Sequence, residues 1–200
     1  MYGLAMRLLL IATHNSHKTA EIRAMLGGHF DVRDLNAHPE IPAAQETGDT
    51  FEANAIIKAL EAARIFPGLV LSDDSGLEVD AIGGAPGVHS ARYAGERASD
   101  AENRAKLLAT LKSLPPCHHS HAARFRCVMA LAEDGKILGT FEGSVEGELI
   151  LEERGESGFG YDTLFIPAGE QETFAQLRSE IKNQLSHRAF ALAKLRSFLL

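Results

Sequence analysis

The fold and the chemistry are both indicated by one stretch of sequence, LSDDSGLEVDAIGGAPGVHSARYAG, which spans Leu71–Gly95. An apolar, strand-like run passes directly into two adjacent carboxylates, Asp73 and Asp74, and a loop rich in glycine follows. Carboxylates at the end of a strand, beside glycines that let the backbone approach a ligand, suit a hydrated Mg²⁺ bridged to phosphate oxygens. An Asp-Ser-Gly triplet alone is more typical of a surface turn. The whole segment favours a metal and phosphate site.

The composition predicts one globular domain, residues 1–200, which can be built as two lobes. Of its 200 residues, 45% are hydrophobic. The net charge is −7, whereas a nucleic-acid-binding protein usually carries a basic surface. No window reaches the roughly 20 apolar residues of a membrane span. The segment Cys117–His121 is predicted to be an exposed loop rather than a metal site. We therefore expect a soluble, cytoplasmic protein with no nucleic-acid or membrane partner.

The order of predicted elements is β-α-β-α-β, then a hairpin, then C-terminal helices, which indicates an α/β fold with a mixed sheet. Capping boxes at Asp49–Glu52 and Ser99–Glu102 predict two helix starts. The first apolar run is too short for a signal peptide, and Met6 is an alternative start because residues 1–5 carry no motif. The predicted helices are residues 18–26, 49–66, 99–114 and two segments that meet at 186, and the predicted strands are 7–12, 69–72, 121–132 and 137–150.

A polar turn, Thr13–Lys18, lies where the first strand passes into a helix. The N–H groups and the positive dipole end of such a helix make an anion site. Lys18 adds a mobile charge, and Thr13 and Asn15 can donate hydrogen bonds to phosphate oxygens. A polar loop that only caps the helix explains these residues equally well, so both interpretations stay open.

Taken together, five blocks of the sequence resemble the inosine triphosphate pyrophosphatase family, whose members hydrolyse non-standard purine nucleoside triphosphates. Their order is that of the family over nearly the full chain, which makes the match specific. The resemblance implies an elongated two-lobed mixed β-sheet flanked by helices, with the active site in the cleft between the lobes. His14 and His17 stand where the family usually has glycine. Besides Leu71–Gly95, the blocks are IATHNSHKTAEI (Ile11–Ile22), ETGDTFEANAIIKA (Glu46–Ala59), GFGYDTLF (Gly158–Phe165) and EIKNQLSHRAFAL (Glu180–Leu192).

The resemblance also implies a Mg²⁺-dependent active site built on three carboxylates. Glu46 and Asp74 would bind the metal, and Asp74 would also accept a proton from the attacking water. Asp73 would serve as a second ligand or as an orienting group. The residues predicted to bind the substrate's phosphate end are Thr13, Asn15, Lys18 and Ser75.

The last two blocks are predicted to bind the base. Stacking on an aromatic ring is worth roughly 1–3 kcal/mol whatever the base, although Phe159 and Tyr161 could equally be core residues. Lys182 and the pair His187-Arg188 cannot share one face of one helix, so a helix break at Ser186 is needed to bring them together. Arg188 is the candidate donor to the 6-oxo group of hypoxanthine or xanthine; a solvated helix face is the alternative. The predicted base-binding residues are Phe159, Gly160, Tyr161, Asp162, Lys182, His187 and Arg188.

The sequence thus predicts a Mg²⁺-dependent pyrophosphatase that converts ITP, dITP, XTP and dXTP to the monophosphate and pyrophosphate and so cleanses the nucleotide pool. The resemblance further implies a homodimer. A pyrophosphatase acting on pyrimidine or modified nucleotides and a nucleotide sensor without turnover are the alternatives. Three carboxylates argue against the sensor, because binding alone needs no positioned base.

Overall fold

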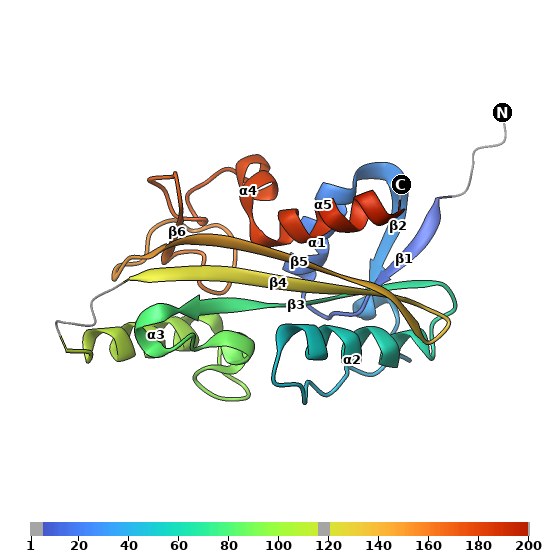
Figure 1. Cartoon of the computed structure of the whole chain (residues 1–200), viewed down its shortest axis with the longest axis horizontal. Coiled ribbons are helices and arrows are strands. Elements are labelled where there is room, and N and C mark those ends of the chain that lie inside the picture. Colours follow the sequence, from blue (N-terminus) through green and yellow to red (C-terminus); the bar gives the residue numbers. More distant parts are fainter. Residues whose placement is uncertain (1–5, 116–120, 200) are drawn as a thin grey trace. The chain divides into compact units, whose positions relative to one another are not determined.

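The computed structural model describes residues 6–115 and 121–199 (Figure 1). Residues 1–5, which precede the alternative start Met6, and residues 117–120 of the predicted exposed loop lie outside the described residues. Contacts within the chain divide it into two compact units. Unit 1 comprises Met1–Asp74, Cys127–Gly143 and Arg188–Leu200, and unit 2 comprises Ser75–Arg126 and Ser144–His187.

Helices and strands alternate along most of the chain, as the sequence predicted. The helices are α1 (Ser16–Leu26), α2 (Phe51–Ala63), α3 (Asp100–Lys112), α4 (Ser179–Leu185) and α5 (His187–Leu199). The strands are β1 (Arg7–Ile11), β2 (Phe30–Asp34), β3 (Leu69–Val79), β4 (Ala122–Glu133), β5 (Lys136–Leu149) and β6 (Phe165–Pro167). Four short 3-10 helices are η1 (Gly27–His29), η2 (Leu35–Ala37), η3 (Asp80–Ile82) and η4 (Gly87–Arg92).

The strands form a six-stranded sheet in the order β2-β1-β3-β4-β5-β6. β1 runs parallel to both β2 and β3, whereas β5 and β6 are antiparallel. The predicted mixed sheet is therefore confirmed. Strands β2 and β6 were not predicted from the sequence. With five and three residues, these strands are too short to give a clear period-2 signal.

The predicted turn between β4 and β5 is also confirmed. Asp134 and Gly135 have φ values of 50° and 71°, the left-handed pair that a two-residue hairpin turn requires. Asp134 is the only non-glycine residue in the described chain with positive φ. His14 and His17 therefore do not adopt the left-handed backbone conformation that would favour glycine.

In the strands of unit 1, successive side chains alternate between the two faces of the sheet, and each face is covered by helices. Leu9 and Leu71 pack into one core with Ile22 of α1 and Leu192 of α5. On the other face, the Ser72 hydroxyl donates to a backbone carbonyl of α2. Figure 1 shows α1 and α5 on one side of these strands and α2 on the other. Side-chain alternation thus decides which helix each residue of β3 meets.

Unit 2 has a separate core, rich in aromatic rings. Phe125 of β4 lies 4.8 Å from Phe165 and 5.9 Å from Phe174 between ring centroids. Leu107 of α3 is fully buried in the same cluster, together with Tyr161. Tyr161 is therefore a core residue, although its place next to Gly160 keeps it in the predicted base loop.

Two helix boundaries test the predicted caps. The capping box of Ser99 and Glu102 at the start of α3 is confirmed. The one predicted from Asp49 is wrong, because the Thr50 side chain caps α2 by accepting from the amide of Ala53. Glu52 instead accepts a hydrogen bond from the hydroxyl of Thr140.

The predicted break near the C-terminus is confirmed. α4 ends at Leu185, Ser186 is extended with φ −79° and ψ 158°, and α5 begins at His187. Among the described residues, the structure contains no helix with the length and apolar character to cross a membrane.

The observed cap of α2 makes a direct prediction. Thr50→Ala should lower the free energy of unfolding by about 1 kcal/mol, because the first turn of α2 loses its acceptor. Asp49→Ala is the matched control, one residue away, and should change it by less than about 0.5 kcal/mol. Urea titration of both variants checks the assignment. A larger loss in Asp49→Ala than in Thr50→Ala would contradict it.

Candidate active site

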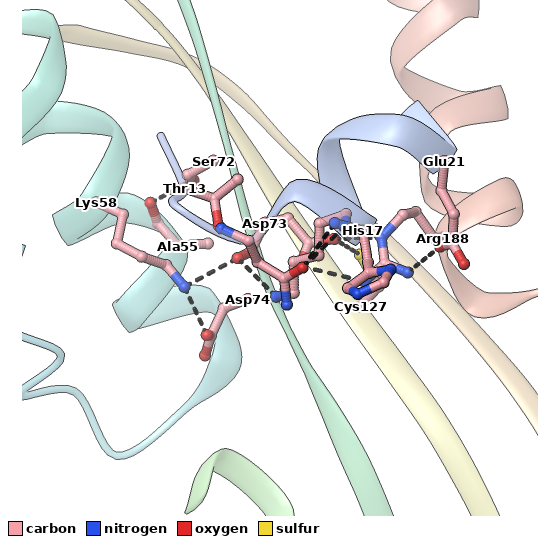
Figure 2. Close-up of polar contacts among 12 residues, drawn as sticks. Thr13, His17, Glu21, Ala55, Lys58, Ser72, Asp73, Asp74, Cys127 and Arg188 are labelled. Carbon is pink, nitrogen blue, oxygen red and sulfur yellow. Dashed lines mark hydrogen bonds and ion pairs between the residues drawn. The ribbon is translucent and has the colours of Figure 1, made fainter. Parts of the chain in front are cut away.

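Asp73 and Asp74 are neighbours in β3, and successive side chains of a strand point to opposite faces. Asp73 shares its face with Leu71 and reaches Cys127 and α5. Asp74 shares its face with Ser72 and reaches α2. Figure 2 shows Asp74 beside Lys58 and Asp73 directed towards Arg188. The two carboxylates therefore have different partners within unit 1.

Asp73 is the centre of a buried charge network. Its side chain has no solvent exposure, and Arg188 donates to it from Nε at 2.9 Å. Lys18 of α1 pairs with the same carboxylate, and the thiol of Cys127 donates at 3.2 Å. A second acid, Glu21, pairs with Arg188. Both oxygens of Asp73 thus accept hydrogen bonds, and α1, β3, β4 and α5 are tied together.

The charges in this network hold one another in their ionised forms. Burial alone would raise the pKa of Asp73, but Arg188 and Lys18 outweigh it and hold that pKa well below its usual range. Burial would lower the pKa of Arg188, but Asp73 and Glu21 raise it instead. Burial, with the charge of Asp73, raises the pKa of the Cys127 thiol well above its usual value. Cys127 therefore stays a protonated donor.

Asp74 belongs to a second cluster, centred on Lys58 of α2. Lys58 Nζ lies 2.7 Å from Asp74 Oδ1, 2.9 Å from Glu46 Oε1 and 2.9 Å from the carbonyl oxygen of Asp73. Burial raises the pKa of Asp74, against the opposing effects of Lys58 and Lys18. Burial would lower the pKa of Lys58, but Asp74 and Glu46 raise it overall. One ammonium group thus brings the two predicted metal ligands together.

Lys58 was not among the predicted site residues, although it lies in the block Glu46–Ala59. The signal was its spacing: Lys58 lies three residues after Ala55 and four before Ala62, both of which are buried, and so shares their apolar face. A lysine on the buried stripe of a helix needs an acidic partner. Glu46 and Asp74 are those partners.

The loop that carries Glu46 is fixed by a buried amide. Asn54 is fully buried, and its Oδ1 accepts from the backbone N–H of Gly48 at 2.8 Å. A Cβ at Gly48 would lie 2.7 Å from Cβ of Ala53. Glycine at this position is therefore required by the close approach of the loop to α2, which sets the position of Glu46 two residues earlier.

The residues of the predicted phosphate loop form the N-terminal cap of α1. Oδ1 of Asn15 accepts from the amides of His17 and Lys18, and Oγ1 of Thr13 accepts from the amide of Asn15. The helix-capping interpretation is thus observed for Asn15. Phosphate binding by Thr13, Asn15 and Lys18 stays a prediction; the dipole of α1 and the ammonium of Lys18 suit it.

The donor set of the site fits a hydrated Mg²⁺. Among the described residues, no cluster of three or more histidine, cysteine, aspartate or glutamate side chains could hold a metal alone. Asp74 Oδ2 is buried without a hydrogen-bond partner, and Glu46 lies across Lys58 from it. Mg²⁺ commonly binds through one or two carboxylates together with waters and substrate phosphates. Glu46 and Asp74 fit that pattern better than Asp73.

The predicted base residues before α5 lie in unit 2. Oδ2 of Asp162 accepts from the amide of Phe159 at 2.9 Å and from Lys182 Nζ at 2.7 Å. Lys182 is buried and lies 5.1 Å from the centroid of the Phe159 ring. The hydroxyl of Tyr161 donates to the carbonyl of Ser90. The loop is thus folded around the buried Asp162–Lys182 pair.

His187 and Arg188 are adjacent but have different partners. His187 is buried and stacks on Phe125 in unit 2, with ring centroids 4.9 Å apart. Arg188 belongs to unit 1, where it pairs with Asp73 and Glu21. The predicted base-binding roles of both residues stay predictions. Arg188 is 1% exposed, so the solvated helix face considered for it is wrong.

Comparison with known proteins assigns the family. A family model described as the Ham1 family matches residues 9–198. The chain belongs to the Ham1 family. This confirms the resemblance seen in the five sequence blocks.

Relatives of known name cover nearly the whole chain. A dITP/XTP pyrophosphatase of Desulforamulus reducens is 48% identical over 93% of this chain and 92% of its own. One of Bacillus subtilis is 45% identical over 98% of both. The solved HAM1 protein of Coxiella burnetii is 40% identical, with a TM-score of 0.84 over 97% of this chain and 98% of its own. The Ham1 fold therefore extends over nearly the whole chain.

The Asp73 network predicts a large effect on stability. Asp73→Asn should lower the free energy of unfolding by about 3–5 kcal/mol, because the variant leaves buried cations without their counter-charge. Asp31→Asn is the control: Asp31 pairs with Arg33 at an exposed site, and its loss should cost less than about 1 kcal/mol. Denaturant titration at pH 7 measures both. Equal losses would contradict a central role for Asp73.

The stabilities of the wild type and of Asp73→Asn should depend differently on pH. The pKa of Asp73 is lower in the folded state, so the unfolded state binds the proton first as the pH falls. The stabilisation is complete above the ordinary carboxyl pKa of about 4 and is lost below it. The stability difference between wild type and Asp73→Asn should be constant from about pH 7 to 5 and shrink below about pH 4. A difference that shrinks already near pH 6 would point to another group.

Proposed function

We propose that this chain hydrolyses the α–β phosphoanhydride bond of ITP, dITP, XTP and dXTP, releasing the nucleoside monophosphate and pyrophosphate. The observation that carries the proposal is the full-length relationship to dITP/XTP pyrophosphatases. The cluster of Asp74, Lys58 and Glu46 supplies chemistry suited to that reaction. Removing such nucleotides would cleanse the pool used for nucleic-acid synthesis.

Asp74 is the proposed general base. It would accept a proton from the attacking water as the bond from water oxygen to the α-phosphorus forms and the bond to the bridging oxygen breaks. Its pKa is raised by burial, and a base with a pKa nearer the working pH accepts a proton more effectively. Its Oδ2, buried without a hydrogen-bond partner, is the atom available for this role.

Cationic side chains would bind the phosphate end of the substrate. Lys18, at the start of α1, and Lys58, between Glu46 and Asp74, are the proposed cations. When bound, Mg²⁺ would be held by Glu46 and Asp74 and would supply charge neutralisation at the phosphates. We favour the orienting role for Asp73, because its Oδ1 already accepts from Lys18 and its Oδ2 from Arg188. The remaining proposed phosphate-end ligands are Thr13, Asn15 and Ser75.

The loop around Gly160 would bind the base. The Phe159 ring offers a stacking surface, which does not distinguish one base from another. Discrimination between a 6-oxo and a 6-amino group requires fixed polar groups, and a site built on such hydrogen bonds can discriminate strongly. Asp162, Lys182, His187 and Arg188 are the proposed polar groups. The predicted homodimer and cytoplasmic location also stay proposals; analytical ultracentrifugation of the purified chain tests the first.

A substrate panel tests the activity. Pyrophosphate and monophosphate release should be measured for ITP, dITP, XTP, ATP, GTP, dTTP and CTP, with and without Mg²⁺. We expect rapid, Mg²⁺-dependent release from ITP, dITP and XTP, and slow release from the standard nucleotides. Preference for a pyrimidine nucleotide, or binding without turnover, would contradict the proposal.

Asp74→Asn should lower kcat for ITP by about 10²–10⁴-fold, because it removes the proposed base at nearly constant volume. Asp80→Asn is the control, since Asp80 is an exposed acid that pairs with Arg124, and should keep wild-type activity. Thermal melting shows whether both variants fold. A folded Asp74→Asn variant with more than a tenth of wild-type activity would exclude Asp74 as the base.

Glu46→Gln should change the metal requirement. It removes one of the two proposed metal ligands, so the Mg²⁺ concentration for half-maximal rate should rise by about tenfold or more. Glu40→Gln, at an exposed site near the same loop, is the control and should leave the Mg²⁺ curve unchanged. Superimposed curves for Glu46→Gln and wild type would remove Glu46 from the metal site.

A further inference from the structure

The loop Gly158–Asp162 is held from outside by a helix to which the sequence analysis gave no role. The amide of Gly160 donates to Oδ2 of Asp100 at 2.6 Å. The carbonyl oxygen of Gly160 accepts from Nη1 of Arg104 at 2.9 Å. Both polar groups of this residue are therefore bound by α3. Asp100 and Arg104 are four residues apart, so they lie on one face of the helix.

The helix that makes these contacts is itself firmly anchored within unit 2. Between the two residues, Asn103 accepts from the amide of Ala94 and donates to the carbonyl of Ala91. Leu107 is fully buried and Leu111 nearly so. α3 therefore provides a rigid support that can fix the position of a loop.

The backbone conformation of Gly160 depends on hydrogen bonds from outside the loop. Its φ is +60°, and that of Gly158 is +79°, a region that glycine enters readily but does not prefer strongly. Within the loop, Asp162 accepts from the amide of Phe159, and it also accepts from Lys182 of α4, so neither of these hydrogen bonds involves Gly160. Arg104 is additionally held by Glu153 at 2.8 Å, which fixes its guanidinium.

We propose that Asp100 and Arg104 are positioning residues that set base selectivity by clamping Gly160. The proposal rests on the proposed function, since it assigns these residues to the base pocket of that reaction. Stacking tolerates small displacements and any base, whereas hydrogen bonds to the base edge do not. Loosening the clamp should therefore reduce discrimination more than it reduces turnover, because both residues bind the backbone of the proposed base loop in unit 2, whereas Asp73, Asp74 and Glu46 belong to unit 1.

The test is the ratio of kcat/KM for ITP to that for ATP. A misplacement on the order of 1 Å can cost about 10²-fold in rate, so a loosened loop is expected to lower this ratio by about tenfold in Asp100→Ala and in Arg104→Met. kcat for ITP should fall by less than about threefold. Asp100→Asn keeps an acceptor for the Gly160 amide and should retain the wild-type ratio within about threefold.

Glu102→Ala is the matched control in the same helix turn. It removes the capping box of α3 without touching Gly160, so it should lower the melting temperature but leave the ITP-to-ATP ratio unchanged. A ratio lowered equally in Glu102→Ala and Asp100→Ala would overturn the proposal, because the effect would then come from the helix and not from the clamp. Asp100→Asn behaving like Asp100→Ala would also overturn it.

The wild-type ratio separates the two proposals. If the wild type shows no preference for ITP over ATP, the proposed function fails and the clamp fails with it. If the wild type is selective and both Asp100→Ala and Arg104→Met keep its ratio within twofold, only the clamp is overturned. Uniform loss on both nucleotides would likewise overturn the clamp, because it would show a general structural effect.

Discussion

A carboxylate with no solvent exposure is tolerated only where opposite charge compensates it, and Asp73 imposes that requirement on unit 1. Lys18 comes from α1 and Arg188 from the first turn of α5, so two helices from opposite ends of the chain must meet at β3. Glu21 then balances the second cation. Apolar packing alone would allow these helices to slide, whereas charged hydrogen bonds fix their positions. Because this network fixes α1, it also fixes the position of the predicted phosphate loop at the start of that helix.

Strand geometry separates the roles of two identical side chains. Because Asp73 and Asp74 point to opposite faces, Asp73 pairs with two cations, Lys18 and Arg188, whereas Asp74 shares the single ammonium group of Lys58 with Glu46. Their pKa values accordingly move in opposite directions. This is how one sequence pair can supply a permanently ionised anchor and a carboxylate suited to accepting a proton. Exchanging their environments would require slipping the strand by one residue, which would turn its whole apolar set away from the core.

Much of this arrangement was predictable from the sequence, and the exceptions have physical causes. The helix break at Ser186 followed from periodicity, because Lys182 and Arg188 cannot share a helix face. The family followed from the order of five blocks. The α2 cap was assigned to Asp49 because Asp and Thr are both good caps, and only the chain direction at Thr50 decides between them. A role for Lys58 was predictable in principle, because it shares a helix face with Ala55 and Ala62, which are buried.

The partners of Asp73 could not be predicted, because they depend on which helices cover which face of β3. For the same reason, the hydrogen bonds that α3 makes to the base loop could not be predicted. Asp100 and Arg104 are separated from Gly160 by 60 and 56 residues, and neither lies in a recognisable block. The residues that would touch the nucleotide are concentrated in the blocks, whereas those that hold them in position are spread over the fold. Substitutions in α3 could therefore alter base discrimination while the proposed reacting groups at Asp74 and Lys58 stay unchanged.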